Sequence, residues 1–366
     1  MSLDRYHRHE LIDWFSQDQL ARARVVVVGA GAVGNEVVKN LALLGVGEIR
    51  IFDFDLIEEH NLTRSVLFRD TDIGNSKADI AAQRAGELDP NISVTAVGGD
   101  FWDHLSLVEL QGFDVLFCCV DNFEARIRCN TMCRIAGVDL INVGIDSRFA
   151  LIEQFPFGRA DCGCFECNLP PSVYRRISER YSCGHLRKLS FVERKVPTTI
   201  ITSSAAASLA VSVGLRLGND ATDPRSMRYY LDTIAGHLTR TELDRVELCP
   251  CCSRFQSGLP IVACRPEIGA WPQDANDATV TFSEPLLCAY RIDDTVTPVF
   301  EPAARFDSDY PATLHSDPGL VDLEVRDQFT MTELVARFSS RAIPCKFAMV
   351  EGKRTATVFE FIREAK

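Results

Sequence analysis

The stretch FDFDLIEEHNLTR, residues 52–64, carries polar residues whose types and spacing suit nucleotide binding. Asp53 ends an apolar run that is typical of a buried strand, and a carboxylate at such a strand end can hold the hydroxyl groups of a ribose. One acidic residue is enough for an ordinary dinucleotide site. Here Asp55, Asn61 and Arg64 follow at short range. The sequence therefore predicts a site that binds more than a ribose.

Two further charged residues lie at the ends of neighbouring predicted elements. Lys77 begins a predicted helix, and Asp121 follows the predicted strand VLFCCV. Hydride transfer needs no group of cations around phosphate. Cleavage of an α–β phosphoanhydride does, because negative charge builds up on the departing pyrophosphate. We therefore predict that Asn61, Arg64 and Lys77 bind the phosphates of ATP. Asp121 would bind Mg²⁺, which commonly takes one or two carboxylates together with phosphate oxygens.

Each of these residues also has an ordinary structural explanation. Arg64 and Lys77 can be solvated surface charges. Asp121 can cap the helix that begins in NFEARIR, and Asn61 can stabilise a turn. The joint occurrence of the four residues in this order is what favours the nucleotide site.

The motif GAGAVG places Gly29, Gly31 and Gly34 in GxGxxG spacing after four valines. Glycines permit a tight turn and a close approach of phosphate to the backbone, and the following helix offers free N–H groups and a positive dipole end. The motif alone is weak, since it can be a simple strand–helix turn. Its position after a strand favours nucleotide binding. The sequence contains no GxxxxGK[ST], which argues against a P-loop ATPase.

Two cysteine pairs suit a structural zinc site. Cys164 and Cys167 come from CGCFEC, and Cys249 and Cys252 come from CPCC. Four thiolates form a closed tetrahedral site that leaves no position for a substrate. The long gap between the pairs makes the spacing only suggestive, and the alternative is a set of reduced, buried thiols. The neighbouring Cys162 and Cys251 leave the choice of ligands open.

Cys183, in RYSCGHLRK, lies between the two cysteine pairs. Basic neighbours favour the thiolate, which is the nucleophilic form of cysteine. Cys183 is therefore a candidate nucleophile. The alternative is a loop thiol without a covalent role.

The elements that must position these residues alternate between strand and helix up to about residue 148. This order predicts an α/β fold with a doubly wound, mostly parallel Rossmann-like sheet. The segment FALIEQFPF, residues 149–157, is expected to form an antiparallel edge strand. Pro, Asp and short strand-like runs dominate after Arg254. We therefore expect an N-terminal arm or helix (1–24), a nucleotide-binding domain with a crossover segment (25–253) and a smaller α+β domain (254–366).

Composition limits the class of protein further. The 366 residues are 46% apolar and 25% charged, with a net charge of −12, which argues against broad binding of nucleic acid. The N-terminus has no signal-peptide pattern, and the 14 cysteines then suggest a reducing, cytoplasmic setting. The charge-poor run 196–215 is long enough for a membrane span, but it is rich in Ser, Thr and Ala. We expect a helix buried against another subunit or domain, and no membrane span.

Taken together, these motifs resemble the ubiquitin-activating-enzyme-like family, with its ThiF/MoeB-type adenylyltransferases of sulfur-carrier proteins. The likeness covers about residues 5–253 and rests on RYHRH, GAGAVG, FDFD, NLTR, GNSKAD, CCVDNFEAR and the two cysteine pairs. The resemblance implies that Mg·ATP adenylates the C-terminal glycine of a ubiquitin-like or sulfur-carrier protein. It also implies that the paired cysteines hold a structural zinc.

The resemblance gives roles to single residues as well. It implies that Asp53 binds the ribose, with Asp55 beside it in the nucleotide site, and that Arg8 reaches the ATP site of the neighbouring subunit in a homodimer. It also implies that Cys183 can take the activated carboxyl as a thioester. The family usually has Gln where this chain has Ser65, and this departure weakens the detail expected around the phosphates.

Several alternatives remain open from the sequence. Residues 255–366 faintly resemble the ubiquitin-like domain that docks a carrier enzyme in conjugation-type relatives, which favours conjugation over sulfur transfer. A structural cap explains this region equally well. A NAD-dependent oxidoreductase explains the glycines and Asp53, but not the basic residues and cysteine pairs. An inactive partner subunit or scaffold is the non-enzymatic alternative.

Overall fold

The computed structural model describes residues 5–173, 197–215, 225–267, 278–303, 319–353 and 355–362. The chain divides into two compact units, which are described separately. The first contains Met1–Asn168 and Lys195–Gly258, and the second contains Leu169–Arg194 and Leu259–Lys366. The division after Gly258 lies five residues beyond the one expected after residue 253.

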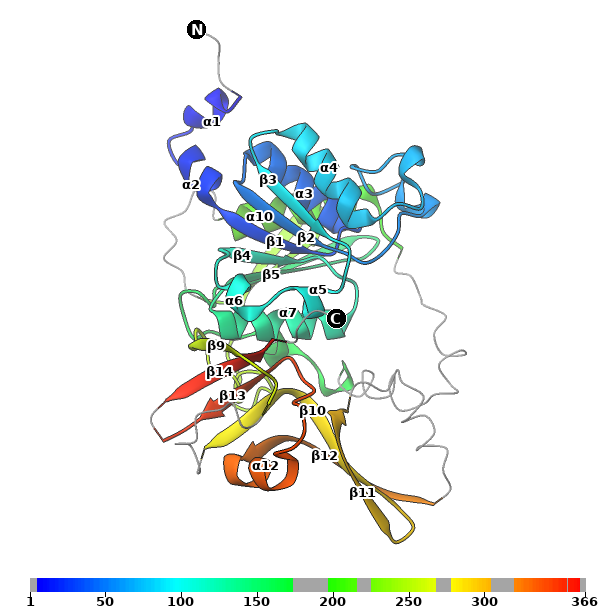
Figure 1. Ribbon diagram of the computed structural model, residues 1–366. Helices are drawn as coiled ribbons and strands as arrows, with labels where there is room; N and C mark the ends of the chain where they lie inside the picture. The colour runs from blue at the N-terminus through cyan, green and yellow to red at the C-terminus, as the bar shows by residue number, and fades with distance from the viewer. Residues whose placement is uncertain are drawn as a thin grey trace. The chain divides into compact units, whose positions relative to one another are not determined.

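An eight-stranded sheet forms the centre of the first unit, in the order β3-β2-β1-β4-β5-β6-β7-β8 (Figure 1). Strands β1 to β5 pair in parallel, whereas β6, β7 and β8 pair in antiparallel fashion. The predicted mostly parallel sheet with an antiparallel extension is therefore confirmed. The strands are β1 (Arg24–Val28), β2 (Glu48–Phe52), β3 (Ser93–Val97), β4 (Val115–Cys118), β5 (Asp139–Ile145), β6 (Phe149–Phe155), β7 (Met227–Asp232) and β8 (His237–Glu242).

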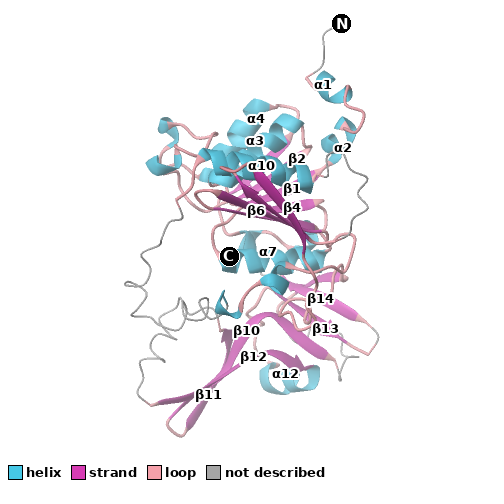
Figure 2. Ribbon diagram, turned by 180° about the vertical axis from the view of Figure 1, so that it is seen from behind, coloured by secondary structure: helices cyan, strands magenta, loops and turns pink. Residues whose placement is uncertain are grey.

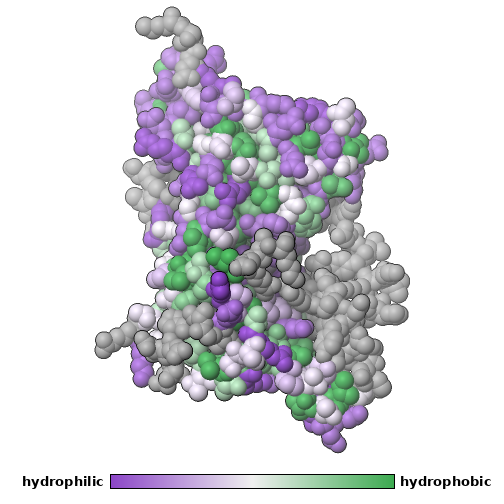
Figure 3. All heavy atoms as spheres, viewed as in Figure 1, coloured by the Kyte–Doolittle hydropathy of each residue, from purple (hydrophilic) through white to green (hydrophobic). Residues whose placement is uncertain are grey.

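Helices cover both faces of this sheet, as a doubly wound fold requires (Figures 1 and 2). One face carries α3 (Ala32–Leu44), α4 (Lys77–Leu88) and α10 (Ile200–Gly214). The other carries α5 (Phe101–His104), α6 (Leu107–Leu110) and α7 (Phe123–Ala136). Because β1 is covered on both sides, its four valines are buried. The predicted arm consists of two short helices, α1 (His7–Glu10) and α2 (Gln17–Arg22), and the surface over these and α4 is mainly hydrophilic (Figure 3).

The segment expected to be an edge strand lies inside the sheet. β6 pairs with β5 on one side and with β7 on the other. The hairpin of β7 and β8 turns at Gly236, whose φ is 66°. All six residues of β8 are exposed, so this strand lacks the apolar alternation by which strands are recognised in a sequence.

The apolar run 196–215 packs within its own unit. Helix α10 contacts α3, β5 and β6, where the expectation was burial against another subunit or domain. Ala206, Ala207 and Ala210 are fully buried on this face, and their small side chains let the helix lie close to the sheet. Among the described residues, no helix has the length and apolar character that crossing a membrane would need.

The second unit is an α+β domain, as predicted. Its sheet has the order β11-β10-β13-β14-β9, and β12 also pairs with β10. Four phenylalanines from β10, β11, β12 and α12 pack against one another in its core, mostly edge to face. Strands β13 and β14 form an antiparallel hairpin near the end of this unit. The elements are β9 (Ile261–Cys264), β10 (Thr279–Ile292), β11 (Thr295–Pro302), β12 (Leu320–Thr330), α12 (Met331–Phe338), β13 (Phe347–Glu351) and β14 (Ala356–Phe361).

Candidate functional site

The glycine motif forms a tight turn between β1 and α3. Gly29 has a φ of 92°, which favours glycine, and its N–H donates to the carbonyl of Phe52 at the end of β2, with an N–O distance of 2.8 Å. A Cβ on Gly34 would lie 1.8 Å from the Gly29 carbonyl oxygen, so only glycine fits there. A Cβ on Gly31 would meet no atom within 4 Å. The turn is thus closed toward the protein and open at Gly31, as a phosphate cradle at a helix N-terminus requires.

Asp53 ties the end of β2 to this turn. One carboxylate oxygen accepts from the backbone N–H of Ala30 at 2.6 Å, and the other accepts from the N–H of Asp55 at 2.8 Å. Burial raises the pKa of Asp53 above its ordinary value, while these two hydrogen bonds act in the opposite direction. A carboxylate offers about four acceptor positions, so Asp53 keeps capacity for ribose hydroxyls. Its part in shaping the glycine turn was not predicted from the sequence.

Asp55, the second acidic residue after β2, forms an ion pair with Lys77. Its carboxylate pairs with the ammonium of Lys77, with an O–N distance of 2.7 Å. The Lys77 side chain is 11% exposed and the Asp55 side chain is 55% exposed. The backbone N–H of Lys77 also donates to the carbonyl of Asp55 at 3.0 Å. The cation is therefore held next to Asp53, and its counter-ion faces solvent, where phosphate oxygens can replace it.

The side chain of Asn61 is engaged within its own turn. Its carbonyl oxygen accepts from the N–H of Glu58 at 2.9 Å, and its amide nitrogen lies 3.2 Å from Nε2 of His60. This geometry supports the structural explanation of Asn61 as a turn residue. Arg64 donates to the carbonyl of His60 at 2.7 Å and is partly exposed, so the other nitrogens of its guanidinium group remain available to phosphate.

Asn35 is a positioning residue that the sequence analysis missed. It is fully buried, its amide nitrogen donates to the carbonyl of Ala30 at 2.7 Å, and its amide oxygen accepts from the N–H of Leu67 at 2.8 Å. The side chain therefore joins the glycine turn to the chain that follows NLTR. The only local signal was an amide directly after Gly34, and it does not identify the partners of the side chain.

Asp121 lies in the loop between β4 and α7, and its side chain is exposed. The helix cap is its neighbour Asn122, which accepts from the N–H of Ala125 at 2.8 Å. The explanation of Asp121 as the cap is therefore wrong. The backbone N–H of Cys119 donates to the carbonyl of Val28 at 2.8 Å, which brings this loop beside the glycine turn. Within the described part of the chain, no hydrogen bond or ion pair occupies the Asp121 carboxylate, which suits a magnesium ligand.

Arg8 and Cys183 complete the predicted set. The arm that carries Arg8 is anchored on its own unit, because Tyr6 donates to Asp89, and Nδ1 of His9 lies 2.9 Å from Oε1 of Gln17. Arg8 itself is exposed, and the described residues give it no ion pair. Cys183 lies outside the described residues. The structure thus joins the glycine turn, Asp53, Asp55 and Lys77 by direct hydrogen bonds, but it gives no contact between these residues and Arg8, Arg64 or Asp121.

The four paired cysteines lie together in the first unit. Their sulfur atoms are all within 4.8 Å of one another, with 3.5 Å between Cys164 and Cys249 and 3.6 Å between Cys167 and Cys252. A tetrahedral zinc ion with Zn–S bonds of about 2.3 Å would separate its sulfur ligands by about 3.8 Å. The cluster therefore fits a metal such as zinc. Cys251 lies outside it, with its sulfur 3.9 Å from Oγ1 of Thr131.

A buried arginine fastens the chain on both sides of the cluster. Arg134, on α7, is fully buried and donates to the carbonyl of Phe255 at 2.7 Å, to the carbonyl of Cys162 at 3.2 Å and to the carboxylate of Asp161 at 2.6 Å. Its hydrogen bonds join the chain beside the first cysteine pair to the chain beyond the second. The motif CNTMCRIAG gives no local sign of this role, because the acceptors are far away in the sequence.

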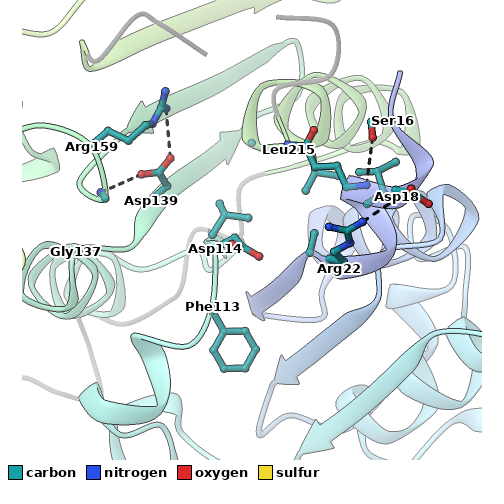
Figure 4. A pocket seen from close by; sticks show the side chains of 15 residues that line it. Ser16, Asp18, Arg22, Phe113, Asp114, Gly137, Asp139, Arg159 and Leu215 are labelled. Carbon is teal, nitrogen blue, oxygen red and sulfur yellow. Dashed lines mark hydrogen bonds and ion pairs between the residues drawn. The ribbon is translucent and has the colours of Figure 1, made fainter. Parts of the chain in front are cut away.

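A cavity of about 690 Å³ lies at the opposite edge of the sheet, at the amino ends of β1, β4 and β5 (Figure 4). Asp139 on its wall accepts from the N–H of Gly158 at 3.1 Å and pairs with Arg159 at 3.4 Å (Figure 4). The cavity is lined by none of the predicted site residues. Ligands of doubly wound sheets bind outside the carboxyl ends of the strands, which keeps the glycine turn as the candidate site.

The chain is similar to several known proteins. A model of the ThiF family matches residues 4–250. The chain is 37% identical over 172 residues to the SAMP-activating enzyme E1 of Haloferax volcanii, covering 46% of this chain and 62% of that protein. It is 33% identical over 175 residues to the sulfur carrier protein adenylyltransferase of Thermus thermophilus, covering 46% and 64%. The matched part thus spans less than two thirds of either relative.

Among solved structures, the chain resembles E. coli MccB in a complex with AMPCPP and selenomethionine MccA. The TM-score is 0.54 and the sequence identity is 25%, over 69% of this chain and 75% of that one.

Proposed function

The chain belongs to the ThiF family, and from this premise we propose that it uses ATP to adenylate the C-terminal carboxylate of a small protein substrate. The observation that carries the proposal is the hydrogen-bonded group at the carboxyl ends of β1 and β2. This group combines a glycine turn that is open at Gly31, the carboxylate of Asp53 and the cation of Lys77. Relatives named as activating enzymes or adenylyltransferases support the same reaction.

In this reaction the substrate carboxylate attacks the α-phosphorus of ATP. A bond forms between a carboxylate oxygen and the α-phosphorus. The bond between the α-phosphorus and the oxygen that bridges it to the β-phosphate breaks, and pyrophosphate leaves with that oxygen. Lys77 exchanges Asp55 for phosphate oxygens and offsets the developing negative charge, together with Arg64. Mg²⁺, when bound at Asp121, supplies further neutralisation of the phosphates. Arg8 from a second copy of this chain adds one more cation, which makes a homodimer part of the proposal.

We assign the cysteine cluster to zinc and give it a structural role. Four thiolates close the coordination shell, so Cys164, Cys167, Cys249 and Cys252 leave no position for a substrate. The metal fixes the two ends of the segment that contains Cys183. The segment would then connect two positions that the metal holds in place, namely the two cysteine pairs.

The test of the adenylation step is ATP–pyrophosphate exchange. We expect exchange that requires a ubiquitin-like or sulfur-carrier protein ending in Gly and that is lost when this terminal residue is deleted. The reason is that pyrophosphate can be reincorporated only from an acyl-adenylate. The control is a thermal shift with Mg·ATP and with NAD, since a ligand stabilises only the folded state that binds it. Stabilisation by NAD alone, without any exchange, would overturn the proposal in favour of an oxidoreductase.

The proposed second step is a thioester on Cys183. Its thiolate attacks the acyl carbon, a C–S bond forms, the acyl–phosphate bond breaks and AMP leaves. If the chain works in conjugation, the acyl group then passes from Cys183 to a carrier enzyme. If the substrate is a sulfur-carrier protein, no transfer to a carrier enzyme follows. We expect Cys183→Ala to keep exchange while losing an adduct that dithiothreitol cleaves, as measured on non-reducing gels. An adduct that persists in Cys183→Ala would place the thioester on another cysteine.

A further inference from the structure

A row of polar side chains runs from the Asp121 loop into the antiparallel part of the sheet. It begins at Arg126 on α7, whose guanidinium group donates to two acceptors. One is the carbonyl oxygen of Val120, the residue before Asp121, and the other is the side-chain oxygen of Asn142 on β5. Arg126 thereby connects the backbone of the proposed magnesium loop to the middle of the sheet.

The row continues across three adjacent strands at one register. Asn142 on β5 is the partner of Glu153 on β6, which is the partner of Arg228 on β7. The amide nitrogen of Asn142 donates to Oε2 of Glu153 at 2.7 Å. Oε1 of Glu153 accepts from Nε and Nη2 of Arg228 at 3.0 and 2.6 Å. Asn142 is 2% exposed and Glu153 is 1% exposed, so the buried carboxylate depends on these partners.

The chemistry of the row permits only one arrangement of its donors and acceptors. Arginine can only donate and an ionised carboxylate can only accept. Between Arg126 and Glu153, Asn142 must turn its oxygen toward the arginine and its nitrogen toward the carboxylate. A reversed amide would oppose two donors on one side and two acceptors on the other. Glu153 therefore fixes the orientation of Asn142, and Asn142 fixes Arg126.

The loop that contains Asp121 also packs closely against the glycine turn. A Cβ on Gly29 would lie 2.9 Å from the carbonyl oxygen of Cys119 and 3.4 Å from Cγ1 of Val120. The backbone at 119–120 is thus held between Gly29 and Arg126. Its position determines where the carboxylate of Asp121 lies relative to the phosphate cradle.

We propose that Asn142 and Glu153 are positioning residues, which set Asp121 for the Mg²⁺ of Mg·ATP by holding Arg126 on the carbonyl of Val120. This inference rests on the proposed function, because it assumes Mg·ATP at the glycine turn. Neither residue touches the nucleotide. They act on the position of Asp121 through Arg126 and the loop backbone. Residues that hydrogen-bond to the ligands of a metal orient those ligands in a similar way.

Two single variants and their combination test this arrangement. Glu153→Gln places an amide donor against the donor of Asn142 or of Arg228. Asn142→Asp opposes two carboxylates. The double variant restores every pair, because the new carboxylate at position 142 accepts from Arg126 and from the new amide at position 153. The oxygen of that amide then accepts from Arg228. We expect each single variant to weaken Mg·ATP binding and slow exchange by about 10- to 100-fold, with the double variant returning to within about threefold of the original chain.

The decisive readout is equilibrium binding of ATP, measured by calorimetry with Mg²⁺ and with EDTA. The inference predicts that the single variants lose affinity in Mg²⁺ and keep the affinity for ATP in EDTA. An equal loss in both conditions, or no recovery in the double variant, would overturn it. So would an original chain whose ATP affinity is independent of Mg²⁺. If the chain binds Mg·ATP but catalyses no exchange with any substrate, the proposed function is rejected. The inference is then still decided by the ratio of the ATP affinities in Mg²⁺ and in EDTA, compared between the variants and the original chain.

Discussion

Asp121→Ala is expected to lower substrate-dependent ATP–pyrophosphate exchange by about 100- to 1,000-fold, a loss typical of removing one group that stabilises charge in a transition state. The free energy of unfolding should hardly change. The Asp121 side chain is exposed, and in the described part of the chain it makes no hydrogen bond or ion pair whose loss would destabilise the fold. The measurement pairs initial exchange rates at saturating substrate with a urea unfolding curve.

The neighbouring Asn122→Ala variant is the matched control. Asn122 caps α7, so its replacement should cost about 1 kcal/mol of stability, as is usual for a lost helix cap. Its effect on exchange should be much smaller than that of Asp121→Ala. An unchanged exchange rate in Asp121→Ala would remove this residue from the mechanism and leave the phosphates to Lys77 and Arg64.

The parts of the fold that could be predicted are those with a local, periodic signal. A strand covered by helices on both faces is apolar throughout, and this is why the run Val25–Val28 was recognisable. Helix α7 ends at Gly137, whose φ of 69° favours glycine, and a glycine in this position is a common local signal for the end of a helix. The hairpin of β7 and β8 escaped prediction for the opposite reason, because β8 is exposed along its whole length and shows no apolar face.

The candidate site was predictable where a motif is compact and not where contacts are distant. Lys77 and Asp55 do meet, because the end of β2 and the start of α4 belong to one βαβ crossover from β2 to β3. The buried amide of Asn35 and the row from Arg126 to Arg228 could not be inferred. Their partners are set by strand register and by loop packing, which leave no pattern in the local sequence. Asn61 illustrates the converse, since its amide is taken up by its own turn.

Loss of the proposed zinc is expected to be the largest single cost to stability. Cys249→Ser should abolish zinc binding and lower the free energy of unfolding of the first unit by about 4 kcal/mol or more. We take this value from the stabilisation that a disulfide provides when it closes a loop of similar length, because both cross-links restrict the unfolded chain. Cys164 and Cys249, whose sulfurs lie 3.5 Å from each other, are 85 positions apart in the chain. For a unit of this size, the change corresponds to a fall in Tm of about 8–16 °C.

The chain supplies its own control for that experiment, since Cys162 belongs to the same CGCFEC motif and lies outside the cluster. Cys162→Ser should retain one zinc per chain by atomic absorption and lose far less stability, because a partly exposed sulfur without a metal bond contributes little. A shared loss of zinc in Cys162→Ser and Cys249→Ser would mean that the ligand set is wrong. Full zinc in Cys249→Ser would refute the site itself, because a tetrahedral thiolate site that loses one of four ligands in a buried position should not keep its metal.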